Sequence, residues 1–378
     1  MRPIAFFALL ATTALPWGHA LAADVAPDDQ CSGPCLVYSG TFDLKADWLR
    51  SSDSAIDNSF IIGPSSESDF TLKATDSLSV IANIISEPVE DAIPGDNQIF
   101  SGGGTYVDVL QAQIDFENLS IWGGKIHPLF GRAWDVTPGL HGTDLAENYD
   151  LTERLGAGAS YSFEAAGLAN RLQASAFTVD RTIFSESLFT NRGRASLADG
   201  GAGNTKAVSS LAVALDGCIG AEADSCYEDG SFGYQIAARY QKGSYGNELG
   251  FLASLNKSVP LSDEASLRLF GEAAWFRNFD GSADDAFMAT GSAALEMGPA
   301  TYSLAYSQQT LLVAGGADTT EYLVDASAMY ALGDTVSFAG ETWSVGAGYA
   351  YDHADGESFQ TIGLRLSAEY GASIPLGN

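Results

Sequence analysis

The chain has 378 residues, of which 46% are hydrophobic and 17% are charged, and its formal net charge at pH 7 is −30. This acidic excess argues against a nucleic-acid-binding protein, because phosphate recognition needs clustered lysine and arginine. After the N-terminal region the chain has no apolar run of about 18 residues, so the sequence predicts no transmembrane helix.

The N-terminus has the pattern of a secretory signal peptide. Arg2 carries the only early positive charge, Ile4–Leu15 is a short apolar core, and Pro16 follows it. Ala20-Leu21-Ala22 is a small-x-small cleavage site. We therefore expect an exported protein that is cleaved near Ala22.

Leu36–Leu49 is the first strongly patterned stretch. Its even positions, from Leu36 through Trp48, are mostly apolar, and its odd positions include Asp43 and Lys45. A period of two predicts a β-strand. About a dozen residues exceed the usual soluble strand of roughly five or six and suffice for the roughly 9–11 that span a bilayer. Tyr38 and Trp48 lie on the apolar face near its ends, as interfacial aromatic residues do.

The same alternation recurs down the chain and predicts sixteen strands in all. An even number places both ends of a single-chain bacterial barrel on the same side of the membrane. After Leu36–Leu49 the predicted strands are Asp69–Thr75, Leu78–Ile85, Tyr106–Phe116, Leu119–Ile126, Arg154–Phe163, Arg171–Val179, Val208–Asp216, Phe232–Tyr240, Glu248–Asn256, Leu267–Trp275, Ala286–Met297, Thr301–Gln308, Tyr322–Tyr330, Trp343–Tyr351 and Ile362–Tyr370.

The connections between these strands alternate in length, which is typical of an outer-membrane barrel with short periplasmic turns and long external loops. The short connections include residues 76–77, 117–118, 164–170 and 298–299. The long connections include Arg50–Ser68, Ser86–Gly104, His127–Glu153 and Asp180–Lys206.

Four cysteines form two close pairs in the sequence, Cys31 with Cys35 and Cys218 with Cys226. Disulfides are the default in an exported chain. Four cysteines allow three connectivities, of which the local one is the simplest. Neither spacing is a usual zinc pattern, so no metal site is predicted there. By the alternation of the connections, both pairs lie on the periplasmic side.

The connection 127–153 is a long charged loop that also contains aromatic residues, and these argue against disorder. Loops of this length inside a compact domain are usually functional or disordered, so we expect it to fold into the barrel lumen, between the fifth and sixth strands. It offers the acids Asp135, Asp144, Glu147 and Asp150, with Lys125 and Arg132 nearby. By parity the wall offers Lys45, Lys73, Arg239, Arg268 and Arg365.

Opposed acidic and basic patches would create a transverse field across a constriction, and charges at the narrowest point set selectivity. The alternative is that these charges are merely solvated or form ion pairs within the lumen. His127 and His141 share the loop with Asp135 and Asp144, but the spacing matches no strong metal pattern.

No enzyme signature is present: the sequence has no G-x-S-x-G, H-E-x-x-H or P-loop motif. We predict neither an enzyme nor a cofactor. A catalytic triad is recognised by geometry and not by sequence position, so a barrel enzyme stays an alternative, as does a secreted soluble β-protein.

With these features in place, the chain resembles the sixteen-stranded outer-membrane porins. The stretch GGKIHPLFG looks like the pattern at which porin chains enter their constriction loop, here with Gly124, Lys125, Pro128, Phe130 and Gly131. The resemblance implies that the acids of the 127–153 loop face basic wall residues such as Arg239 and Arg268. It also implies a homotrimer, in contact with outer-membrane lipid and lipopolysaccharide.

The C-terminus departs from this family, whose barrels usually end on an aromatic residue. Here the apolar parity continues through Ala372, Ile374 and Leu376, so the last strand is expected to run on, with Pro375 near its end.

The sequence thus predicts an all-β protein: residues 1–22 as signal peptide, 23–35 as a periplasmic stub and 36–378 as a transmembrane antiparallel barrel. The expected function is passive diffusion of small hydrophilic solutes and ions through the outer membrane, with a mild preference for cations. A substrate-specific uptake barrel, for example one that takes up siderophores, is the alternative within this class.

Overall fold

The structure is a computed structural model that describes residues 34–53, 58–90, 95–223, 225–243, 245–333, 342–354 and 356–376. The predicted signal peptide, most of the predicted stub and Cys31 lie outside these ranges. What the sequence predicts for them stays a prediction.

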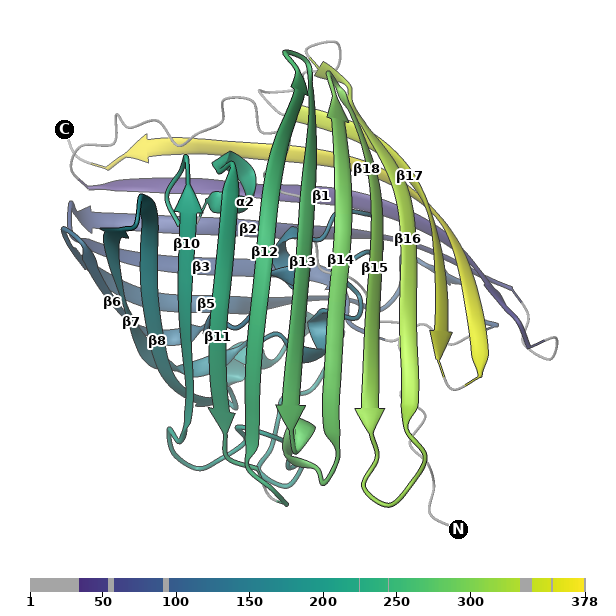
Figure 1. Cartoon of the computed structure of the whole chain (residues 1–378), viewed down its shortest axis with the longest axis horizontal. Helices are drawn as coiled ribbons and strands as arrows, with labels where there is room; N and C mark the ends of the chain where they lie inside the picture. The colour runs from purple at the N-terminus through teal and green to yellow at the C-terminus, as the bar shows by residue number, and fades with distance from the viewer. Residues whose placement is uncertain are drawn as a thin grey trace.

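The described chain forms one closed sheet (Figure 1). Closure follows because β1 (Cys35–Ser51) pairs antiparallel with both β18 (Glu357–Pro375) and β2 (Ser59–Thr75). The sheet has 18 strands, but β4 (Gln98–Ile99) and β9 (Leu188–Phe189) have only two residues each. The barrel wall itself has 16 antiparallel strands, which confirms the predicted fold class and strand number.

Each long strand corresponds to one predicted from the alternation, and most extend a few residues beyond the prediction. The others are β3 (Leu78–Pro88), β5 (Gly103–Phe116), β6 (Leu119–Ile126), β7 (Arg154–Ala165), β8 (Leu168–Val179), β10 (Ser210–Ile219), β11 (Phe232–Gln241), β12 (Glu248–Ser262), β13 (Ala265–Arg277), β14 (Asp285–Met297), β15 (Ala300–Leu312), β16 (Thr319–Ala331) and β17 (Thr342–Ala354).

The barrel is apolar outside and polar inside, the reverse of a soluble protein. On β1 the Trp48 side chain is 57% exposed, whereas Asp43 is fully buried. On β11 the outward Ile236 is exposed and the inward Gln235 is buried. Alternation of lipid-facing and lumen-facing residues is what a transmembrane barrel requires, because its backbone is satisfied by strand pairing and its outer face meets hydrocarbon.

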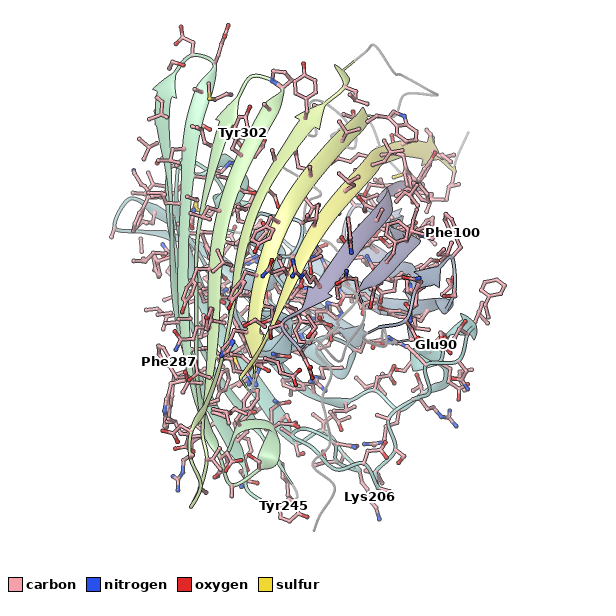
Figure 2. The ribbon with its side chains drawn as sticks, turned by 90° about the vertical axis from the view of Figure 1, so that its right-hand side faces the viewer. Glu90, Phe100, Lys206, Tyr245, Phe287 and Tyr302 are labelled. Carbon is pink, nitrogen blue, oxygen red and sulfur yellow. A yellow bond between two sulfur atoms is a disulfide. The ribbon has the colours of Figure 1, made fainter. Side chains whose placement is uncertain are left out.

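Aromatic residues mark two levels of the outer face. Phe287 lies near one end of β14, and Tyr302 of β15 lies opposite Leu295, near the other end of β14 (Figure 2). At roughly 3.3 Å per residue the two levels are about 26 Å apart along the strand. Because barrel strands are tilted by about 35–45°, the two levels are roughly 20 Å apart along the membrane normal, comparable to an apolar band about 25 Å tall between two aromatic girdles.

The connections only partly follow the predicted alternation. One barrel end has the short turns at residues 76–77, 117–118 and 298–299, as expected. At the other end, the predicted long loop Arg50–Ser68 is wrong, because β2 begins at Ser59 and its polar residues are paired with β1. Polar residues are compatible with a strand here because one of its faces lines the lumen.

The helices are short. They are α1 (Ala133–Val136), α2 (Cys226–Asp229) and the 3-10 turns η1 (Glu147–Tyr149), η2 (Ile183–Ser185) and η3 (Phe279–Gly281). Among the described residues, no helix has the length and apolar character needed to cross a membrane.

The continuation of the last strand and the local Cys218–Cys226 pairing are both as the sequence predicts. β18 continues to Pro375, which pairs with Cys35, and Leu376 N–H donates to the carbonyl of Pro34 at 2.8 Å. The Cys218–Cys226 disulfide is present and joins β10 to α2 at the short-turn end. The predicted partner of Cys35, Cys31, lies outside the described residues.

Candidate functional site

Residues 127–153, which we call the lumen segment, connect β6 to β7 and contain α1 and η1. The backbone and side chains of the segment bond to inward-facing residues of distant strands. Gly131 N–H donates to Gln235 of β11 at 3.0 Å, and Asn148 donates to Gln309 of β15 at 2.9 Å. Since these partners belong to the polar face of the wall, the segment lies on the lumen side.

Glu272 of β13 is the principal anchor of the segment. Its carboxylate accepts the backbone N–H groups of Arg132 at 2.8 Å and Ala133 at 3.2 Å. It also accepts the hydroxyl of Tyr149 at 2.6 Å. Hydrogen bonds to an ionised acceptor are among the stronger ones in proteins, and these three hold the two ends of the segment together.

The far part of the segment is fastened to β16. Leu140 N–H donates to Ser327 at 3.0 Å, and His141 N–H donates to Asp325 at 3.1 Å. Gly139 has φ +122°, and a Cβ there would lie 2.0 Å from Asp325 Oδ1. The close approach of the segment to the wall therefore requires glycine at 139.

Arg239, predicted as a basic wall residue, fastens the segment and is not free to meet a solute. It is buried, its Nε lies 2.7 Å from Glu248 Oε1, and it donates to the carbonyl of Tyr149. Its guanidinium lies 4.6 Å and 4.5 Å from the ring centres of Phe130 and Phe276, within cation–π range.

An apolar cluster fills the space between the lumen segment and the strands from β8 to β14. The rings of Phe130 and Phe276 are 5.7 Å apart at its centre. The buried members of this apolar cluster are Phe130, Ala133, Ala146, Tyr149, Leu151, Phe177, Ala212, Ala214, Ala237, Leu252, Phe270, Ala274, Phe276, Ala286 and Met288.

Charged residues face the segment from the opposite wall, formed by β18, β1, β2, β3 and β5 (Figure 1). We call this the charged side. Its wall residues are Lys45, Asp47, Glu67, Asp108 and Arg365, and the segment contributes His127, Asp135, His141, Asp144 and Asp150.

The first part of the charged side contains both signs. His141 Nε2 lies 3.5 Å from Asp47, and its Nδ1 lies 4.0 Å from Asp144. Burial raises the pKa of Asp144 to about 7, although His141 and Lys45 nearby oppose the rise. Arg365 of β18 is paired with Asp43. Of the predicted wall bases, Lys45 thus lies close to a segment acid, whereas Arg365 pairs with an acid of the neighbouring strand β1.

The second part is predominantly acidic. His127 Nε2 lies 3.0 Å from Asp108 Oδ2 on β5. Burial and the neighbouring Asp135, which is itself exposed, raise the pKa of Asp150 to about 6. Burial alone would lower the pKa of His127, but Asp108 and the acids of the segment raise it to about 9. Glu67 of β2 lies close enough to interact electrostatically with Asp108 and His127.

Two other predicted residues, Lys125 and Arg132, form ion pairs elsewhere. Lys125 Nζ lies 2.6 Å from Glu153 and 3.3 Å from Asp180, so it ties the root of the segment to the next loop. Arg132 Nη2 lies 3.3 Å from Asp216.

The last three predicted site residues differ in position. Arg268 pairs with Glu296 near the short-turn end and is not brought to the segment acids. Lys73 is exposed on β2, close to the turn at 76–77. Glu147 is half-buried in η1.

Sequence reasoning missed the anchoring role of Glu272 and Asp325. Both are on the polar face of predicted strands, so the alternation placed them inside the barrel. The alternation could not predict their partners. These are backbone N–H groups of the lumen segment, which every residue type except proline has.

Comparison with known proteins shows the fold. No protein-family model matches the sequence, and no curated protein matches it. Among solved structures, the outer membrane channel DcaP of Acinetobacter baumannii is 13% identical, with a TM-score of 0.53, covering 90% of this chain and 97% of DcaP. The outer-membrane expressed OmpT of Vibrio cholerae is 11% identical, with a TM-score of 0.51, covering 89% and 97%. This chain has the fold of these outer-membrane barrels, which confirms at the level of fold the resemblance drawn from the sequence.

Proposed function

We propose that this protein is an outer-membrane channel through which small hydrophilic solutes and ions diffuse passively. A wall of 16 strands supports this, because barrels of that size enclose an aqueous lumen. The similarity of its fold to a protein described as an outer membrane channel is in agreement.

The observation that carries the proposal is the division of the lumen. The apolar cluster occupies the side of β8 to β14. The opposite side carries ionisable groups such as Lys45, Asp47 and Asp108. A hydrated solute needs polar walls, so the path runs between the lumen segment and the wall from β18 through β1, β2 and β3 to β5.

In this proposal the lumen segment is the constriction of the channel and its acids set a mild cation preference. Asp135 and Asp150 lie beside Asp108 and His127, and Asp144 lies beside Lys45. Acids outnumber bases along this side, and a ring of carboxylates favours cations.

We also propose a homotrimer in contact with outer-membrane lipid and lipopolysaccharide. β4 lies alongside β2, and β9 alongside β5. They expose Ile99, Leu188 and Phe189, and Phe100 follows β4 at the rim of the barrel (Figure 2). A second copy would cover these side chains. Mass determination in mild detergent is the test, and a monomer would overturn this part.

The test of the function is single-channel conductance of the refolded protein in a planar bilayer, followed by the reversal potential in a salt gradient. Stepwise conductance with a cation preference is expected. The variant D135N/D144N/E147Q/D150N should change both, whereas D263N/E264Q, in the exposed turn after β12, should change neither.

Other outcomes would redirect the proposal. Absence of conductance from folded, inserted protein would favour a barrel enzyme or a specific receptor. Conductance blocked by micromolar concentrations of one solute class, such as siderophores, would favour substrate-specific uptake. Clear anion selectivity would remove the cation preference.

A further inference from the structure

The pairing of β5 with β3 is irregular at one point. Asn83 lies opposite Val109, and the next residue, Ile84, lies opposite Val107. Asp108 is therefore an extra residue on β5, which makes this a β-bulge. A bulge changes which side chains point to which face of the sheet.

The bulge reverses the parity of β5. After it, Gln111 faces the lumen while Ile114 and Phe116 are exposed to the outside. Before it, Tyr106 lies inside, because its hydroxyl donates to Glu87 at 2.6 Å. An uninterrupted alternation from Phe116 would place Asp108 on the lipid face.

Asp108 instead faces the lumen. It is 6% exposed, and its Oδ2 lies 3.0 Å from Nε2 of His127, the first residue of the lumen segment. A carboxylate facing lipid would destabilise the barrel. The bulge turns Asp108 to the lumen, whereas a regular strand would place it on the lipid face.

The surroundings of this pair are acidic. Asp135 and Asp150 of the segment act on His127, and Glu67 of β2 lies near Asp108. Glu67 and Asp69 both accept hydrogen bonds from Asn83, the residue opposite the bulge, at 2.7 Å and 2.8 Å. His127 is thus the basic residue that Asp108 contacts directly. The neighbouring Glu67, Asp135 and Asp150 are acids.

We infer that Asp108 is a further determinant of the ion selectivity of the channel, beside the acids of the lumen segment. The β5 bulge brings it into the lumen, and His127 is the counter-charge that limits its effect. This inference rests on the proposed function. It concerns a position that neither the loop acids nor the strand alternation indicated.

The test compares D108N with H127Q by reversal potential at pH 7. Removing the acid should lower the cation-to-anion permeability ratio by about twofold, and removing the histidine should raise it by about twofold, since one charge close to the path acts at short range. The double variant D108N/H127Q should lie near the wild type. Asp115→Asn, further along the same strand, and His353→Gln, outside the lumen segment, should leave the ratio unchanged.

A purely structural role gives a different pattern. Both single variants break the same ion pair, so a structural role predicts shifts in the same direction, and that result would overturn the inference. An unchanged ratio in D108N that folds and conducts would also overturn it. If D108N does not fold, H127Q and the double variant still decide, because a rise in the ratio in H127Q that is cancelled in the double variant requires the charge of Asp108. No conductance in the wild type would instead contradict the proposed function.

Discussion

The two sides of the lumen differ in what they do. On one side, aromatic and small residues pack against the lumen segment, centred on Phe130 and Phe276. On the other, Lys45, Asp47 and Asp108 present charge to the same segment. Burial of apolar surface holds a segment in place without direction or charge, whereas the charged side is free to act on ions. Under the proposed function, the apolar side holds the segment in place and the charged side acts on ions.

Arg239 illustrates the division. As a lumen arginine it has the residue type of a selectivity determinant, but it is enclosed by Phe130, Phe276 and Glu248. Buried arginine with a complete set of partners supports structure. Lys45, on the other side, lies beside Asp144 of the lumen segment.

The largest expected effect is a loss of stability caused by a substitution on the apolar side. Phe130→Ala removes a fully buried ring and should lower the unfolding free energy by about 3–5 kcal/mol. The measurement is the temperature at which the barrel loses its compact migration in detergent gels. Phe287→Ala, on the exposed outer face, is the control and should shift this temperature little. Equal shifts would contradict the division of roles.

Glu272→Ala should come next. It leaves two backbone N–H groups and the Tyr149 hydroxyl without their acceptor. Buried donors left unpaired cost about 1–3 kcal/mol. We expect noisier and larger conductance steps as the segment loosens. Glu272→Gln keeps an amide oxygen as acceptor and should be milder, so an identical effect of the two variants would argue against hydrogen bonding as the cause.

Removing the Cys218–Cys226 disulfide tests whether the short-turn end of the apolar side contributes only to stability. Tyr227 of α2 packs on Phe270 in a T-shaped contact with ring centres 6.0 Å apart. The sequence separation of the two cysteines is 8, and closing a loop of that size is worth about 2.5 kcal/mol. C218S/C226S should lower the unfolding temperature while leaving the reversal potential unchanged. A change in selectivity would show that this turn also reaches the path.

The smallest expected effect is a change of the cation preference with pH, caused by carboxyl groups on the charged side. The carboxyl pKa values of Asp144 and Asp150 are raised to about 7 and about 6. Both groups are ionised at pH 8 and become neutral as pH falls through these values. Cation preference should therefore decrease between pH 8 and pH 5. D144N/D150N should flatten this dependence, and an unchanged slope in that variant would assign the titration to other groups.

The sequence by itself determined the barrel. Whether a side chain meets lipid or water alternates residue by residue, so the period of two in stretches such as Leu36–Leu49 records the architecture locally. The strand number and the bounds of the lumen segment followed from the same pattern. The local pairing of Cys218 with Cys226 was also predictable, because it spans one connection.

Only the tertiary structure decided which charges meet. Lys45 lies beside the segment acid Asp144, whereas Arg239, Arg268 and Arg365 pair with acids of neighbouring strands. The approach of Lys45 to Asp144 and the pairing of Asp43 with Arg365 join residues far apart in the chain, so no local pattern records them. Asp108 shows the same limit most clearly. A single extra residue in β5 reverses its face, and that irregularity exists only in the pairing with the neighbouring strand.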